Sequence, residues 1–181
     1  MSWARHPHAN RYLAGLSFAE SSFFPIPPDV MLAPMSLARP ERAWRYALLT
    51  TVASVLGGIF GYLIGMFAFE LIEPWLHKLG YWERYTAAVS WFEVWGIWVV
   101  FIAGFSPVPY KVFTITSGVM GMAFLPFVLA SLVGRGARFY LVAGLMVWGG
   151  ARMEKILRDY IDRLGWLTVL VVIVGYVLWK L

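Results

Sequence analysis

The stretch PIPPDV at residues 25–30 interrupts a strongly apolar region, and the similar stretch PVPYKV at residues 107–112 does so again, 82 positions later. Each stretch carries one ionisable residue, Asp29 in the first and Lys111 in the second. Prolines break helices and charges are costly in lipid, so two such breaks need a structural reason. The repeated stretch predicts two turns at membrane depth, formed by Pro25, Pro27, Pro28, Pro107, Pro109 and Tyr110.

Composition indicates a polytopic membrane protein. Of the 181 residues, 60% are hydrophobic and 14% are charged, whereas a soluble domain has about 45–50% apolar and about 25% charged residues. The aromatic content of 18% is typical of rings placed at two bilayer interfaces. We attribute the net charge of +5 to loops and embedded sites, not to nucleic-acid binding. The absence of Cys excludes disulfides and Cys-ligated metals.

Apolar stretches of two lengths predict two kinds of helix. A spanning helix needs about 20 apolar residues, which predicts spans over residues 43–69 and 123–148 and a marginal C-terminal one over residues 165–181. The proline stretches divide two other apolar regions into arms of about 10–13 residues, the length of a re-entrant segment. Irregular backbone at membrane depth must be covered by protein or a cavity, so we expect the two turns to meet inside the molecule. The arms are residues 12–24, 30–38, 93–105 and 112–122.

Lys and Arg predict the orientation. If the first turn opens to the cytoplasm, nine Lys and Arg residues lie on the cytoplasmic side and three on the other, in agreement with the positive-inside rule. The N-terminus is then cytoplasmic. Residues 70–92 form a periplasmic amphipathic segment, and residues 151–164 form a cytoplasmic amphipathic helix.

A second pair of matching phrases predicts an inverted repeat. ASVLGGIFGY at residues 53–62 matches ASLVGRGARF at residues 130–139. We therefore expect an all-α fold in a single membrane domain, residues 1–181. Residues 12–69 and 93–150 are the two inverted repeats, each a re-entrant helical hairpin followed by a Gly-rich transmembrane helix. Transporters built this way bind their substrates near the midplane.

Five embedded ionisable residues are the candidate site. Glu20 and Asp29 belong to the first half, and Lys111, Arg135 and Arg138 belong to the second. A charge at the bilayer centre costs at least about 2.5–3.5 kcal/mol, so we expect pairing. One alternative is a set of purely structural ion pairs, such as Asp29 with Lys111. The other is a polar cavity, in which arginines three residues apart on one helix face hold a phosphate and the acids couple to protons or gate access.

Other polar and small residues allow two interpretations. Gly57, Gly58, Gly61 and Gly65 form a small-residue stripe, which indicates helix packing more often than a ligand site. Thr114, Thr116 and Ser117 either line the cavity or satisfy backbone groups freed by the turn. No Walker loop, HExxH or nucleophile elbow is present, so an ATPase, a zinc protease or an α/β-hydrolase is unsupported, although this absence does not exclude a membrane-embedded transferase. We expect a protein that is not an enzyme and that has no cofactor or metal site.

The residues around the turns resemble a known family. FAESSFFPIPPD at residues 18–29 is similar to the first signature of the DedA family of bacterial inner-membrane proteins, also called the SNARE-associated or VTT domain, and most of all to its YqaA-like branch. Residues 101–121 resemble the second signature, and GRGAR at residues 134–138 resembles the polar start of the following helix. The resemblance covers residues 12–150.

The resemblance implies two facing re-entrant loops and a role in lipid transport, as in flippases for undecaprenyl phosphate or phospholipids. The family's essential acids correspond to Glu20 and Asp29. Its second loop usually carries a pair of arginines, where this chain has Gly104 and Tyr110, with Lys111 following. Arg135 and Arg138 would supply the missing positive charge.

Residues and resemblance together favour a multi-pass transporter or flippase of the bacterial inner membrane. Its expected substrate is an anionic lipid or a lipid phosphate headgroup. Two further candidate partners are protons and a second copy of the chain. One alternative is a non-transporting membrane-integrity or scaffold protein, in which the charges are structural. A less favoured one is a proton-coupled exporter of small cations.

Overall fold

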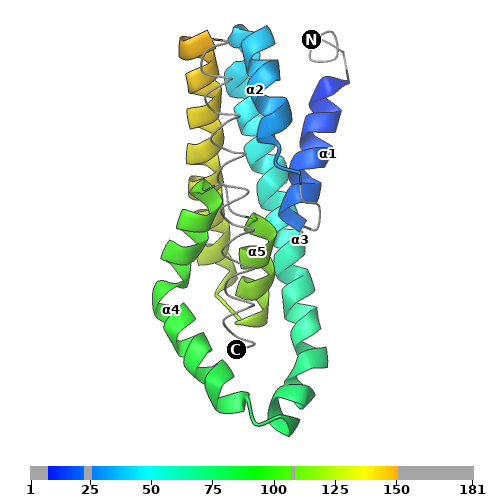
Figure 1. Cartoon of the computed structure of the whole chain (residues 1–181), viewed down its shortest axis with the longest axis vertical. Helices are drawn as coiled ribbons and strands as arrows, with labels where there is room; N and C mark the ends of the chain where they lie inside the picture. Colours follow the sequence, from blue (N-terminus) through cyan, green and yellow to red (C-terminus); the bar gives the residue numbers. More distant parts are fainter. Residues whose placement is uncertain (1–7, 23–25, 107–108, 151–181) are drawn as a thin grey trace, which may run out of the picture.

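The computed structural model describes residues 8–22, 26–106 and 109–150, and these residues form helices and short connections without a strand. The helices are α1 (Ala9–Ser22), α2 (Asp29–Ala38), the 3-10 turn η2 (Pro40–Arg42), α3 (Ala43–Lys78), α4 (Trp82–Phe105) and α5 (Tyr110–Val119). A further long helix, Phe124–Gly150, carries Arg135 and Arg138, and we call it the arginine helix. Figure 1 shows their arrangement.

Three helical segments are long and apolar enough to cross a bilayer: Pro40–Lys78, Trp82–Phe105 and Phe124–Gly150. The first contains the span predicted at residues 43–69, and the third contains all but the first residue of the span predicted at residues 123–148. By contrast, α1 has 14 residues, and α2 and α5 have 10 each. At 1.5 Å per residue they reach about 21 and about 15 Å, less than a hydrocarbon core of about 30 Å.

The structure corrects the predicted end of the first span. The apolar character fades near Phe69, but α3 continues as one helix of 36 residues to Lys78. Residues such as Glu70 are good helix formers, so a change in polarity does not end the helix. The chain turns only at Gly80, whose φ of 72° lies in the left-handed region.

The structure also corrects the arm predicted at residues 93–105. That arm is the C-terminal half of α4, which begins at Trp82 and has 24 residues, enough to cross a bilayer. Residues 70–92, predicted as one amphipathic segment, are instead divided between α3 and α4 by a short connection. The predictions for residues 151–164 and 165–181 lie outside the described residues.

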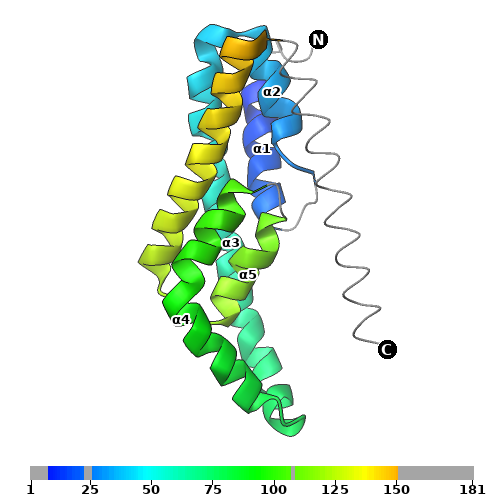
Figure 2. The ribbon, with the colours of Figure 1, turned by 60° about the vertical axis from the view of Figure 1, so that its left-hand side comes forward.

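Glycines let α1 and α5 approach the same stretch of α3 (Figure 2). A Cβ atom at Gly57 would overlap the backbone carbonyl of Phe18 in α1, and one at Gly65 would overlap that of Ile115 in α5. Gly118 of α5 makes the reciprocal contact, with the backbone of Tyr62. The predicted packing role of the small-residue stripe is confirmed, because α3 is the axis against which both short elements pack.

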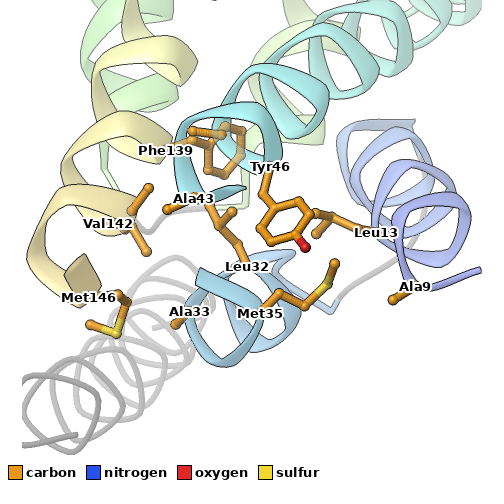
Figure 3. Packing of buried hydrophobic residues seen from close by; sticks show 12 residues of the cluster. Ala9, Leu13, Leu32, Ala33, Met35, Ala43, Tyr46, Phe139, Val142 and Met146 are labelled. Carbon is orange, nitrogen blue, oxygen red and sulfur yellow. The ribbon is translucent and has the colours of Figure 1, made fainter. Parts of the chain in front are cut away.

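Two apolar clusters lie along α3 and the arginine helix, and Figure 3 shows the first of them. The first joins α1, α2, the beginning of α3 and the C-terminal half of the arginine helix. The second joins α3 near Tyr62 with α4, α5 and the N-terminal half of the arginine helix near Phe127. α3 meets the first cluster and then the second, whereas the arginine helix meets them in the opposite order, so the two helices are antiparallel. The buried polar residues of both helices lie between the clusters: Thr50, Thr51 and Ser54 of α3, and Ser131, Arg135 and Arg138 of the arginine helix.

Candidate functional site

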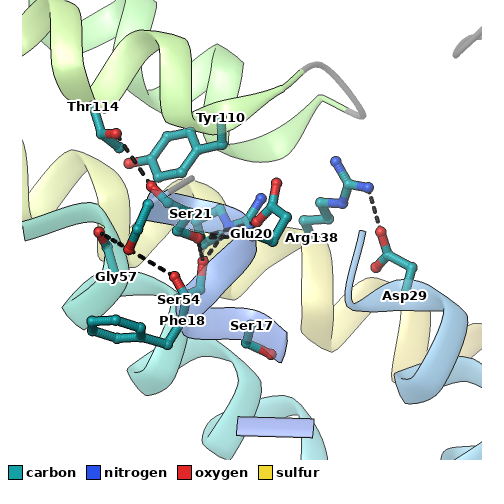
Figure 4. Close-up of polar contacts among 12 residues, drawn as sticks. Ser17, Phe18, Glu20, Ser21, Asp29, Ser54, Gly57, Tyr110, Thr114 and Arg138 are labelled. Carbon is teal, nitrogen blue, oxygen red and sulfur yellow. Dashed lines mark hydrogen bonds and ion pairs between the residues drawn. The ribbon is translucent and has the colours of Figure 1, made fainter. Parts of the chain in front are cut away.

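Four of the five predicted charges meet between the two apolar clusters (Figure 4). Arg135 and Arg138 are three residues apart near the middle of the arginine helix, so they occupy neighbouring positions on one face. Glu20 lies in the last turn of α1 and Asp29 is the first residue of α2. The acids thus come from the first half of the chain and the cations from the second, as predicted.

Arg135 forms an ion pair with Glu20. Arg135 is 1% exposed and Glu20 is 7% exposed. The Arg135 Nε donates to the Ser54 hydroxyl of α3 at 2.6 Å. The Ser21 hydroxyl donates to the Glu20 carboxylate at 3.1 Å and lies 2.7 Å from the Ser54 hydroxyl. This pair is embedded in a hydrogen-bond network that links α1, α3 and the arginine helix.

Aromatic rings cover the Arg135 guanidinium. Its carbon lies 4.9 Å from the ring centre of Tyr110 and 4.7 Å from that of Phe139. Tyr110, the first residue of α5, is fully buried, and its hydroxyl donates to that of Ser131. Cation–π contacts strengthen when water is excluded, so the rings stabilise the buried charge and fix its orientation.

Arg138 forms the second ion pair, with Asp29. Its Nη2 donates to Oδ2 of Asp29, and its Nη1 donates to the backbone carbonyl of Ser106, the residue that ends α4. Asp29 is 1% exposed, yet its Oδ1 has no hydrogen-bond partner among the residues that the structure describes. Arg138 therefore ties the start of α2 to the end of α4 and leaves one carboxylate oxygen unused.

The site balances two arginines against two carboxylates. Removing one partner of a buried pair would leave an uncompensated charge in a low-dielectric interior, at a cost of several kcal/mol. A phosphate can therefore approach either arginine only if the corresponding carboxylate moves away or takes up a proton.

The other predicted site residues lie around the two proline turns. Lys111 is half-buried in the first turn of α5. The structural alternative had suggested Asp29 with Lys111, but Asp29 pairs with Arg138. Pro28 precedes α2 and Pro109 precedes α5. Pro27 is also described, whereas Pro25 and Pro107 lie outside the described residues.

The hydroxyls of Thr114 and Ser117, for which two interpretations were open, donate to backbone carbonyls of their own helix, α5. Thr114 donates to the carbonyl of Lys111 at 2.9 Å, and Ser117 donates to that of Phe113 at 2.7 Å. Such bonds to the carbonyl three or four residues earlier are common inside helices, so they do not decide between the two interpretations. In the part of the chain that the structure describes, no three His, Asp or Glu side chains form a group suited to a metal ion.

Sequence reasoning missed the serines and rings that support Arg135. Ser54 and Ser131 occupy the same position in the two matching Ala-Ser phrases. Ser54 accepts from Arg135, and Ser131 accepts from the tyrosine that covers Arg135. The phrase had been used only as evidence for a repeat, although a hydroxyl at the same place in both copies was also a signal for the site.

Gly104 stands where the resemblance places a loop arginine. It lies in α4, and a Cβ atom there would come within 3.3 Å of the backbone nitrogen of Arg135. The small residue therefore lets α4 and the arginine helix approach each other closely at the level of the site.

Long apolar helices enclosing two buried ion pairs define a polytopic membrane protein with a charged interior. A family model, the VTT domain, matches residues 25–148. The chain belongs to this family, the DedA family, as its proline and acid signatures predicted.

Curated relatives agree with this assignment. An uncharacterized protein of Haemophilus influenzae is 50% identical over 99% of this chain and 94% of its own length. An uncharacterized homologue in Histophilus somni is 49% identical over the same shares. The undecaprenyl phosphate transporter A of Staphylococcus aureus is 31% identical over 48% of this chain and 46% of its own length. No solved structure matches.

Proposed function

We propose that this protein is a proton-linked transporter or flippase of the bacterial inner membrane that moves an anionic lipid through its phosphate headgroup. The observation that carries the proposal is the adjacent placement of Arg135 and Arg138, both buried, on one face of a helix of spanning length. Guanidinium groups match phosphate geometry and keep their charge when buried, which suits them to carry a headgroup through a membrane.

The paired carboxylates supply the link to protons. An anionic headgroup cannot share an arginine with a carboxylate without placing two negative charges side by side. Protonation removes the negative charge of Glu20 or Asp29 and leaves the arginine free to hold the phosphate. Loss of the proton restores the ion pair and expels the headgroup.

Several features support an inverted relation between the two halves around this site, with a re-entrant hairpin in the first half. The helices α1, α2 and α5 are too short to span, and α3 and the arginine helix are antiparallel. Ser54 and Ser131, the paired residues of the matching phrases, lie on these two helices close to the same guanidinium. The halves differ in one respect, because α4 is long where α1 is short. With the first turn open to the cytoplasm, the N-terminus would be cytoplasmic.

The S. aureus relative carries the printed name of an undecaprenyl phosphate transporter, and its similarity favours a lipid phosphate as the substrate here.

One observation favours the alternative of a non-transporting structural protein: all the charged groups of the Glu20–Arg135 network have partners inside the protein. Measurements of lipid transport distinguish the transporter from the non-transporting structural protein.

We expect purified protein in liposomes to exchange a fluorescent phosphatidylglycerol or polyprenyl phosphate between leaflets, and to exchange a neutral lipid more slowly. Arg138→Gln should abolish this exchange, because it removes a charge that would hold the phosphate. Exchange is measured by the accessibility of the fluorophore to a membrane-impermeant quencher.

Arg84→Gln is the matched control, since Arg84 is an exposed cation of α4 and should leave exchange unchanged. Absence of exchange with every lipid in wild-type protein would contradict the transporter and favour the structural alternative. Full exchange in Arg138→Gln would contradict the role assigned to the arginine.

A further inference from the structure

We infer that the two ion pairs have different tasks: Arg138 and Asp29 receive the lipid phosphate and the proton, whereas Arg135 and Glu20 are positioning residues that hold the helices around them. This inference rests on the proposed function and narrows its site to one arginine and one acid. It follows from the different surroundings of two pairs that are chemically alike.

Protein groups take up Nε and Nη2 of Arg135, and two aromatic rings lie close to its guanidinium. Tyr110 and Phe139 lie against its guanidinium at 4.9 and 4.7 Å. In its plane, Nε is bonded to Ser54 at 2.6 Å, and Nη2 is bonded to Glu20 and lies 3.4 Å from the Ser21 hydroxyl. A phosphate would have to displace a carboxylate and two hydroxyls at once, and leave buried polar groups without partners.

Arg138 is held by fewer groups. Its hydrogen bonds run to Oδ2 of Asp29 and to the carbonyl of Ser106, and no aromatic ring of the described residues lies within cation–π distance. It is also more exposed than Arg135, at 8% against 1%. Only one carboxylate oxygen must leave to open a place for a phosphate oxygen.

Asp29 offers a place for the proton. Its Oδ1 is buried and has no hydrogen-bond partner within residues 8–22, 26–106 and 109–150, so a carboxylate there lacks the donors that usually stabilise it. A proton bound at Oδ1 neutralises the group while Oδ2 still faces Arg138. Arg138 is then left with an uncompensated charge, which a phosphodiester oxygen can neutralise in turn.

The two pairs also differ in the elements that hold them. The hydrogen-bond partners of Arg135 are Glu20 and Ser21 in the last turn of α1 and Ser54 in the interior of α3, and glycines pack these two helices tightly together. Those of Arg138 lie at the first residue of α2 and at the residue that ends α4. Figure 4 shows the Asp29–Arg138 pair to one side of the cluster around Glu20 and Ser21. Helix ends can move without breaking the hydrogen bonds of a helix interior, whereas Ser54, which anchors Arg135, lies inside α3, so the second pair is the one that can open.

Binding of a soluble anionic lipid at different pH values tests this division. The probe is dihexanoyl phosphatidylglycerol, whose phosphodiester does not titrate near neutral pH, and binding to the full chain in detergent is measured by titration calorimetry. Wild-type affinity should weaken with rising pH, by up to about tenfold per pH unit if one proton is linked to binding. Asp29→Asn, which imitates the protonated acid, should bind tightly at every pH.

Glu20→Gln should keep the pH dependence of the wild type in the protein that folds, and Glu83→Gln, which alters an exposed acid of α4, is the matched control. An Asp29→Asn variant that keeps the wild-type pH dependence would overturn the inference. So would a Glu20→Gln variant that loses it.

A second measurement does not depend on how these variants fold. The chain has no Cys, so Ser106→Cys introduces a single thiol beside Arg138 and keeps the backbone carbonyl that Arg138 contacts. Saturating dihexanoyl phosphatidylglycerol should slow its reaction with a water-soluble maleimide. An unchanged rate would place the phosphate elsewhere.

Lipid binding that follows the expected pH pattern without leaflet exchange would contradict the proposed transport function. It would leave the division of tasks between the two ion pairs unaffected.

Discussion

Arg135→Met is expected to cause the largest loss of stability of any single substitution at the site. It leaves the Glu20 carboxylate buried without its cation and removes the charge that Tyr110 and Phe139 cover. Breaking a buried pair in this way costs about 3–5 kcal/mol, a large share of the roughly 5–15 kcal/mol that stabilises a typical domain. The variant should accumulate poorly in the membrane and unfold at a much lower temperature in detergent.

A second substitution tests the physical reason. Adding Glu20→Gln removes the uncompensated charge, so the double variant should recover most of the lost stability, as is common when both members of a buried pair are replaced. Arg84→Met is the control, because Arg84 is exposed on α4 and should change the unfolding temperature little. If Arg135→Met unfolds at the wild-type temperature, or if the double variant is no more stable than the single one, the buried pair has been misassigned.

Gly118→Leu is expected to have the second largest effect. A Cβ atom at this position of α5 would overlap the backbone carbonyl of Tyr62 in α3 and approach the backbone nitrogen of Met66 at 2.8 Å. Neither atom belongs to a side chain that could rotate away, so α5 must move off α3. Overpacking typically costs about 1–3 kcal/mol, and the displacement would also carry Tyr110 away from Arg135.

Gly15→Leu is the matched comparison, because a Cβ atom at this exposed helical position of α1 meets nothing within 4 Å. It should be neutral or slightly stabilising, since Leu forms helix better than Gly by up to about 1 kcal/mol. Thermal unfolding of both variants in detergent gives the comparison. Equal unfolding temperatures for Gly118→Leu and Gly15→Leu would contradict the close packing of α3 and α5.

The sequence predicts the participants of the site better than their partners. Charges are so costly in lipid that Glu20, Asp29, Arg135 and Arg138 had to be buried together. The pairing depends on which helix faces meet, and an offset of one residue turns a side chain by about 100°. That information lies in the packing at the glycines of α3, so the sequence alone could not separate Arg138 from Lys111 as the partner of Asp29.

Helix boundaries show a related limit. The proline turn before α2 was predicted because proline acts locally, through its ring and its missing N–H. The end of α3 was misplaced because the change from apolar to polar residues at Phe69 reports the environment of a helix, not its end. The same error shortened α4, whose polar first turns at Trp82 and Glu83 were assigned to an interfacial segment.

Leaflet exchange of a fluorescent anionic lipid under an imposed pH gradient tests the central claim most directly, namely that neutralising a buried acid opens an arginine to the headgroup. On the acidic side, the buried acid takes up a proton and the arginine binds the lipid headgroup. On the alkaline side, the protein releases both the proton and the lipid. Wild-type protein in liposomes should therefore accumulate the lipid in the leaflet that faces the alkaline solution. An equal distribution between leaflets, with and without the gradient and in the presence of exchange, would contradict the account.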